Sequence, residues 1–142
     1  VKWIQDFRRS VDYLQTRDDI DISRLGFFGL SWGGWNGPIV MALDDRFKAG
    51  VYVGGGIPPT RARPEASSAS FSARVTAPVL MVSGRHDMLR PVETYQAPMF
   101  ESLATPAQHK RYAILDGGHI PPKNQLIRET LAWYDTYLGR VE

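Results

Sequence analysis

The spacing of apolar residues at the start of the chain predicts an amphipathic helix over residues 1–17. Apolar positions recur there mostly at intervals of three and four, which places them on one face of a helix, while Lys, Asp and Arg occupy the other face. These apolar positions are Trp3, Ile4, Phe7, Val11 and Leu14. The acidic run Asp18-Asp19-Ile20-Asp21 ends the pattern, so we expect the helix to stop before it.

Beyond this helix, short apolar runs alternate with helical patterns. The runs do not alternate between apolar and polar residues, which is typical of strands buried on both faces of a sheet. We expect strands over residues 25–30, 49–53, 79–83 and 112–115, and helices over residues 32–43, 92–103 and 125–138. Strands that alternate with helices predict βαβ units, so the expected fold class is α/β: a parallel sheet of about four strands flanked by helices.

The segment over residues 57–77 has a different composition. Its three prolines and its run of Ser and Ala indicate a long irregular excursion rather than a regular element. The chain has 142 residues, which is the size of one ordinary domain. We therefore expect residues 1–142 to form a single compact domain that includes this excursion.

Composition excludes several classes of protein and site. The chain is 43% hydrophobic and 23% charged, a globular balance that excludes disordered and collagen-like proteins. Its net charge of +2 is too small to indicate a nucleic-acid-binding groove. It has no cysteine, which excludes a disulfide framework and a thiol nucleophile. The three histidines lack the spacing of a zinc site, so we expect no metal and no organic cofactor.

The sequence also bears on membranes and location. No apolar run approaches the ~18 residues of a membrane span, and the N-terminus does not have a signal-peptide profile. We therefore expect no membrane partner and favour a cytoplasmic location. The first residue is Val1 rather than Met, which is consistent with a processed, trimmed or incomplete chain.

A candidate nucleophile lies between the first predicted strand and the helix that follows it. Gly29-Leu30-Ser31-Trp32-Gly33 is a G-x-S-x-G pentapeptide in the strand–turn–helix context of a nucleophile elbow, which exposes the serine hydroxyl at the carboxyl end of a sheet. We expect the turn to require glycine at positions 29 and 33, because a side chain at either position would collide with the adjoining strand or helix. The alternative is a glycine-rich turn without chemistry.

An activated serine needs a general base, and only three histidines are available. His119 lies between the fourth predicted strand and the last helix, at the same carboxyl edge as Ser31. His109 precedes that strand and therefore belongs to the opposite edge. His86 lies at the correct edge but directly precedes Asp87, which is the stronger candidate for the site. We therefore interpret His86 and His109 as surface histidines.

The carboxylate that would orient the base is predicted from the loop after the third strand. Asp87 follows that strand by four residues and lies at the carboxyl edge. Asp116 is the competitor, but it belongs to the same loop as His119. The pair Asp44-Asp45 ends a helix at the opposite edge, and we expect it to be solvated. Because Ser31, Asp87 and His119 follow three different strands, they converge at one rim of a parallel sheet.

At this point the chain resembles the α/β-hydrolase superfamily, specifically its dienelactone-hydrolase and prolyl-oligopeptidase-like esterase branches. The matching segments are the elbow at 29–34, the strand and acid loop formed by 78–84 with Asp87 and Pro91, the histidine loop Gly117-Gly118-His119 and the closing helix at 126–138. The resemblance covers nearly the whole chain, and it implies a Ser-Asp-His triad in that order along the sequence.

The family places several strands and an oxyanion-hole loop ahead of the elbow, whereas only about 30 residues precede Ser31 here. The chain therefore resembles the C-terminal half of the fold. One oxyanion donor is the backbone N–H of Trp32, at the start of the elbow helix. The second donor normally comes from the other half, and the Gly54-Gly55-Gly56 loop is a possible substitute.

The leading functional hypothesis is a serine hydrolase that cleaves small carboxylic esters through an acyl-enzyme. In it Ser31 attacks the carbonyl carbon, His119 moves the proton and Asp87 holds the imidazole. The alternatives are a catalytically silent half-domain or association module, and a peptidase. Four aromatic residues either line a substrate pocket or belong to the core. They are Trp32, Trp35, Tyr52 and Phe71.

The missing half also predicts self-association. In the parent fold the elbow strand is flanked on both sides, but here residues 25–30 would form an end strand. Its sequence, Leu-Gly-Phe-Phe-Gly-Leu, has no charge or proline to protect an exposed edge. We therefore expect a homo-oligomer, a dimer or a larger assembly.

Overall fold

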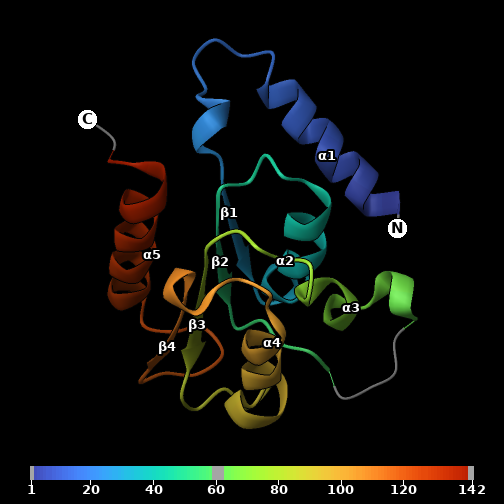
Figure 1. The fold of residues 1–142 in the computed structure, drawn as a ribbon. Helices are drawn as coiled ribbons and strands as arrows, with labels where there is room; N and C mark the ends of the chain where they lie inside the picture. The colour runs from blue at the N-terminus through green and yellow to red at the C-terminus, as the bar shows by residue number, and fades with distance from the viewer. Residues whose placement is uncertain (1, 59–62, 141–142) are drawn as a thin grey trace.

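The computed structural model describes residues 2–58 and 63–140, and their centre is a four-stranded parallel sheet (Figure 1). The strands are β1 (Gly26–Leu30), β2 (Ala49–Val53), β3 (Val79–Gly84) and β4 (Lys110–Leu115). Their order in the sheet is the order in the sequence, and each neighbouring pair is parallel. The predicted α/β class and parallel sheet are therefore confirmed, and all four carboxyl ends lie at one edge.

Helices cover both faces of this sheet. They are α1 (Lys2–Leu14), α2 (Trp32–Leu43), α3 (Ser68–Ser72), the π-helical segment η3 (Val92–Gln96) that continues into α4 (Ala97–Ser102), and α5 (Lys123–Leu138). Figure 1 shows α5 on one side of the sheet and α1, α2 and α3 on the other. The two central strands, β2 and β3, are covered on both faces and cannot expose alternate side chains, which explains their mostly apolar sequences. The end strands β1 and β4 are only partly buried.

Two hydrophobic cores result, one on each face. Every residue of β2 and β3 is buried. On one face Phe27, Tyr52 and Met81 pack with residues of α1, α2 and α4. On the other face Val51, Val53, Leu80 and Val82 pack against Trp133 of α5.

The structure differs from the sequence-based expectations at several element boundaries. The first helix ends at Leu14 rather than residue 17, and β4 begins at Lys110 rather than 112. The expected helix over 92–103 is divided into η3 and α4. The 57–77 segment is not wholly irregular, because it contains a 3-10 turn at Pro64–Ala66 and α3. Residues 59–62 of that segment lie outside the described part of the chain.

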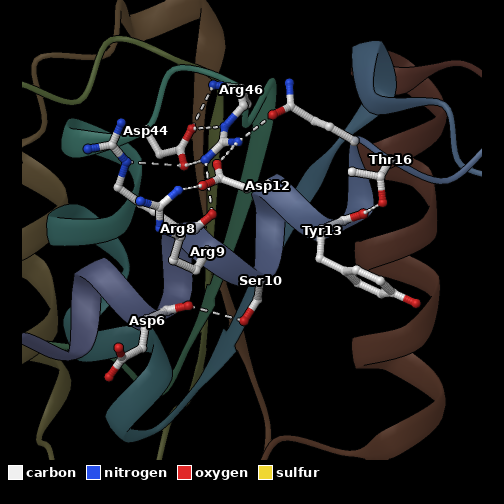
Figure 2. A network of polar contacts seen from close by, with 10 residues as sticks. Asp6, Arg8, Arg9, Ser10, Asp12, Tyr13, Thr16, Asp44 and Arg46 are labelled. Atoms are coloured by element: carbon white, nitrogen blue, oxygen red, sulfur yellow. Dashed lines mark hydrogen bonds and ion pairs between the residues drawn. The ribbon is translucent and has the colours of Figure 1, made fainter.

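A network of charges joins α1 to the connection between α2 and β2 (Figure 2). Arg46 donates hydrogen bonds of 2.7 Å to Asp44 Oδ1 and to Asp12 Oδ1, and Arg8 Nε lies 3.7 Å from Asp44 Oδ2. The side chain of Asp44 is only 1% exposed, so the expectation that it is solvated was wrong. Burial raises the pKa of Asp44, but the hydrogen bonds from Arg46 outweigh this effect and hold its pKa below the ordinary value.

The loops after β3 and β4 run side by side at the carboxyl edge. The Arg85 N–H donates to the Leu115 carbonyl at 2.8 Å, and the His86 N–H donates to the Gly117 carbonyl at 2.9 Å. This approach requires a glycine at the end of β3, because a Cβ on Gly84 would lie 1.8 Å from the Gly118 carbonyl oxygen. Gly84 therefore fixes the distance between the two loops.

Within the described residues β1 lies at one end of the sheet, as expected. An apolar groove beside it is lined by Phe28, Leu126, Ile127, Thr130 and Leu131. Phe28 is 47% exposed. Self-association through this edge stays a prediction. Among residues 2–58 and 63–140, no helix has the length and apolar character needed to cross a bilayer.

Two glycines provide a matched test of the loop packing. Gly84→Ala places a methyl group against backbone atoms that cannot rotate away, so we expect the free energy of unfolding to fall by about 1–3 kcal/mol. Gly33→Ala is the control, because a Cβ there meets nothing within 4 Å outside its own helix. Thermal unfolding of both variants measures the difference. Equal stability of the two variants would contradict the role of Gly84.

The charge network predicts how stability depends on pH. Because the folded-state pKa of Asp44 is depressed, its contribution is complete above the unfolded-state value of about 3.9 and is lost as the pH falls through the lower folded-state value. Asp44→Asn should therefore lower the free energy of unfolding by about 1–3 kcal/mol at pH 7. The gap in this free energy between wild type and variant should narrow below about pH 4. Urea unfolding at pH 7 and pH 3 measures this gap, with Asp45→Asn as the exposed control. A gap that is unchanged at pH 3 would refute the assignment.

Candidate active site

Ser31 occupies a one-residue turn between β1, which ends at Leu30, and α2, which begins at Trp32. Its φ of 55° is the only positive value at a non-glycine position in the described chain. The turn is held on both sides, because the Ser31 N–H donates to the Val53 carbonyl at 2.7 Å and the Ser31 carbonyl accepts from the Trp35 N–H at 2.8 Å. A strained backbone of this kind places the hydroxyl at the carboxyl edge of the sheet.

The glycines around Ser31 are only partly explained by the steric argument. A Cβ on Gly29 would lie 2.4 Å from the backbone of Gly33, so the expectation for Gly29 is confirmed. The expectation for Gly33 was wrong, because that position opens onto free space. The second glycine that the turn requires is Gly34, where a Cβ would lie 2.7 Å from the Val53 carbonyl oxygen.

His119 lies between Ser31 and Asp87. Its Nε2 is 2.8 Å from Ser31 Oγ, and its Nδ1 is 2.8 Å from Asp87 Oδ2. A carboxylate can only accept, so Nδ1 donates to Asp87 and Nε2 is left to accept the proton of the Ser31 hydroxyl. The structure thus brings together the three residues that the sequence proposed for the site.

The carboxylate of Asp87 has no exposed surface. Its Oδ1 accepts from the backbone N–H groups of Leu89 and Arg90, both at 2.9 Å. Its Oδ2 accepts from Gln96 Nε2 at 3.0 Å and from His119. Four donors therefore satisfy the approximately four acceptor sites of an ionised carboxylate, which fixes the side chain in one orientation.

Gln96, the last residue of η3, is a site residue that the sequence reasoning missed. It is fully buried, and its amide oxygen accepts a hydrogen bond from the Ser83 hydroxyl. The Tyr112 hydroxyl lies 3.0 Å from Ser83 Oγ, and burial raises the pKa of Tyr112 to about 12. The orientation of the Gln96 amide, and with it the donor to Asp87, is therefore set by a buried chain of polar groups.

The competing residues lie outside this arrangement. Asp116 is exposed and pairs with His86, whose Nε2 is 3.1 Å from its carboxylate. His109 precedes β4 and lies 3.2 Å from the Tyr137 hydroxyl. Among residues 2–58 and 63–140, no group of three or more His, Asp or Glu side chains is arranged to hold a metal ion.

Backbone donors near Ser31 are limited. Trp32 is the first residue of α2, so its N–H has no acceptor within the helix and lies at the positive end of the helix dipole. The N–H of Gly54 donates to the Val82 carbonyl at 2.9 Å. The Gly54 N–H is therefore not free to act as the second oxyanion donor. Of the Gly54-Gly55-Gly56 loop suggested for that role, Gly54 is excluded.

A second missed residue is Arg90. Its Nη1 donates to Ser31 Oγ at 3.2 Å and to the Gly54 carbonyl at 2.9 Å, and its guanidinium lies 5.7 Å from the centre of the Trp35 ring. The only signal in the sequence was the position of Arg90 three residues after Asp87. Spacing along a loop does not show which groups the end of a long side chain reaches, so this signal was not sufficient.

The surroundings of Ser31 are partly apolar. Of the four aromatic residues considered from the sequence, Tyr52 and Phe71 are buried in the core, whereas Trp32 is 56% exposed. The loops that carry Asp87 and His119 also expose large apolar side chains. These are Met88, Leu89 and Ile120.

Comparison with known proteins gives a consistent picture of the fold. A sequence model of the prolyl oligopeptidase family matches residues 1–57, and no curated protein matches the chain. A cold-adapted esterase from an Arctic intertidal metagenomic library is 22% identical, with a TM-score of 0.79, over 95% of this chain and 57% of its own. Acetyl xylan esterase from Paenibacillus sp. R4 is 20% identical, with a TM-score of 0.79, over 95% of this chain and 52% of its own.

A peptidase has the same fold. Acylaminoacyl peptidase, in complex with Z-Gly-Gly-Phe-chloromethyl ketone, is 19% identical, with a TM-score of 0.79, over 98% of this chain and 28% of its own. The present chain thus spans about half the length of the two esterases and less of the peptidase. The chain therefore has the α/β-hydrolase fold, of which it contains part.

Proposed function

We propose that the protein is a serine hydrolase that cleaves small carboxylic esters. The observation that carries this proposal is the continuous chain of two 2.8 Å hydrogen bonds from Ser31 through His119 to the buried Asp87. A serine hydroxyl whose proton can pass to an oriented imidazole is an activated nucleophile. The esterases of the same fold also support the assignment.

In the first half of the reaction, Ser31 Oγ attacks the carbonyl carbon of the ester while its proton passes to His119 Nε2. The carbonyl oxygen becomes an oxyanion, and the Trp32 N–H at the start of α2 stabilises its charge. Collapse of this intermediate breaks the bond to the alcohol. The alcohol leaves with the proton from Nε2, and the acyl group remains on Ser31.

In the second half, water takes the place of the alcohol. It gives a proton to Nε2 as it attacks the acyl-enzyme, and Ser31 regains its proton when the acid leaves. Asp87 accepts from Nδ1 throughout, which keeps the imidazole in the productive tautomer and stabilises its positive charge. Because Asp87 is fully buried and hydrogen-bonded at both oxygens, it supplies this charge without moving.

Two further functions have support of their own. The acylaminoacyl peptidase neighbour and the prolyl oligopeptidase family match favour a peptidase, which would use the same three residues on an amide bond. The apolar groove beside β1 favours an association module without catalysis. An ester and its matching amide, offered to the same preparation, distinguish these functions.

Substitution of the three residues tests the proposed reaction. We expect Ser31→Ala and His119→Ala each to lower kcat/KM for p-nitrophenyl butyrate by at least about 10³-fold. The double variant should be little worse, because the two residues act as a unit. Asp87→Asn should lose about 10²- to 10⁴-fold, because the wrong tautomer of His119 is then favoured.

The control for the acid is Asp116→Asn, which removes a carboxylate from the neighbouring loop. Its kcat/KM should stay within about threefold of wild type, because Asp116 pairs with His86 rather than His119. A greater loss for Asp116→Asn than for Asp87→Asn would overturn the assignment of the acid. Equal rates for wild type and Ser31→Ala would overturn the proposed function itself.

A further inference from the structure

Arg90 brings a positive charge into direct contact with the proposed nucleophile. Three parts of the chain hold its guanidinium: the Ser31 hydroxyl, the Gly54 carbonyl and the Trp35 ring. None of these groups carries a negative charge. The proposed reaction, which uses Ser31, Asp87 and His119, does not require a cation at this place.

The backbone of Arg90 is fixed as firmly as its side chain. Its N–H donates to Asp87 Oδ1 at 2.9 Å, and its carbonyl accepts from Gln96 Nε2 at 2.6 Å. The buried carboxylate and the buried amide thus hold Arg90 from both sides. A guanidinium that is oriented before a ligand arrives loses little conformational entropy on binding.

The charge of Arg90 is not neutralised by the protein that surrounds it. Within residues 2–58 and 63–140, Arg8, Arg9, Arg46 and Arg111 each pair with a carboxylate, whereas Arg90 pairs with none. Asp87, which accepts a hydrogen bond from the Arg90 backbone N–H, already has four donors at its two oxygens. The Nε and Nη2 groups of Arg90 make no hydrogen bond to these described residues. These two parallel donors, the fork with which a guanidinium binds a carboxylate, are therefore free.

We propose that Arg90 binds a carboxylate of the substrate, so that the site selects esters that carry a free carboxylate near the scissile bond. This inference rests on the proposed ester hydrolysis. A planar guanidinium with two free donor groups matches a carboxylate in a bidentate arrangement. Since Nη1 is 3.2 Å from Ser31 Oγ, a carboxylate on the fork lies only a short aliphatic spacer from the carbon under attack.

A second possible role for Arg90 makes a different prediction. If Nη1 instead stabilised the oxyanion, it would accelerate every ester to the same degree, because all esters form that charge. A carboxylate-binding residue accelerates only esters with the second charge. The ratio of rates for a charged ester and its neutral isostere therefore separates the two roles.

The experiment uses two matched pairs of alkyl esters, followed by the release of alcohol or acid. Monomethyl glutarate and methyl glutaramate place the carboxylate, or its amide isostere, in the acid part. 4-Acetoxybutanoate and 4-acetoxybutanamide place it in the alcohol part. Wild type, Arg90→Gln and Arg90→Lys are compared, with Arg85→Gln as the control that removes an exposed charge from the same loop.

For at least one pair, we expect wild type to prefer the carboxylate ester by about 10- to 100-fold in kcat/KM. Arg90→Gln should abolish the preference, because it lowers kcat/KM for the carboxylate ester by a larger factor than kcat/KM for the neutral isostere, and Arg90→Lys should keep part of the preference. Arg85→Gln should keep it fully. No preference in wild type, or an equal loss for both members of each pair in Arg90→Gln, would overturn the proposal.

A binding measurement separates this proposal from the proposed function. If wild type hydrolyses none of the four esters, ester hydrolysis fails as the function, and the same compounds are then titrated as ligands. Trp35, beneath the guanidinium, reports binding through its fluorescence. If wild type binds each carboxylate ester more tightly than its amide isostere and Arg90→Gln does not, the role of Arg90 is supported. Equal affinity for both members in wild type would refute it.

Discussion

The arrangement at the carboxyl edge depends on the burial of one carboxylate. Asp87 has no exposed surface, so its charge is tolerable only if hydrogen bonds replace the lost water. Four donors do so, and they come from the Asp87 loop, from η3 and from the histidine loop. Each donor is thereby fixed in place. The same interactions that stabilise Asp87 orient His119 toward Ser31 and hold the backbone of Arg90, so the geometry of the whole site follows from this requirement.

Much of the fold could be predicted because parallel sheets impose simple rules. A strand buried on both faces must be continuously apolar, and β2 has the predicted bounds 49–53 for that reason. Parallel strands also place all their carboxyl ends at one edge, so residues that follow different strands meet there. This rule placed Ser31, Asp87 and His119 at one edge and excluded His109, whereas Asp116 was set aside because it belongs to the same loop as His119. It does not depend on the details of any side-chain packing.

The features that the sequence did not reveal depend on distances between side chains. The π-helical segment η3 has only five residues, about one turn, which is too short to leave an apolar spacing different from that of an α-helix. Nothing in the sequence therefore distinguished η3 or the inward direction of Gln96. Asp44 was taken for a solvated residue because the sequence does not show that α1 brings Arg8 against it, nor that the side chain of Arg46 turns back onto it. Lys110 was taken for a loop residue, yet it begins β4, an end strand of the described sheet, where charge is expected at an exposed edge. Arg90 reaches Ser31 only because the two loops meet in space.

The central claim is that Ser31 is an activated nucleophile, and covalent labelling tests it most directly. A fluorophosphonate reacts with a serine whose proton is taken by a neighbouring base, and it does not require knowledge of the substrate. After reaction with the folded protein, peptide mapping by mass spectrometry identifies the modified residue. The account predicts modification of Ser31, with little labelling of the His119→Ala variant. Modification at another serine, no modification of Ser31, or equal labelling of wild type and His119→Ala would contradict it.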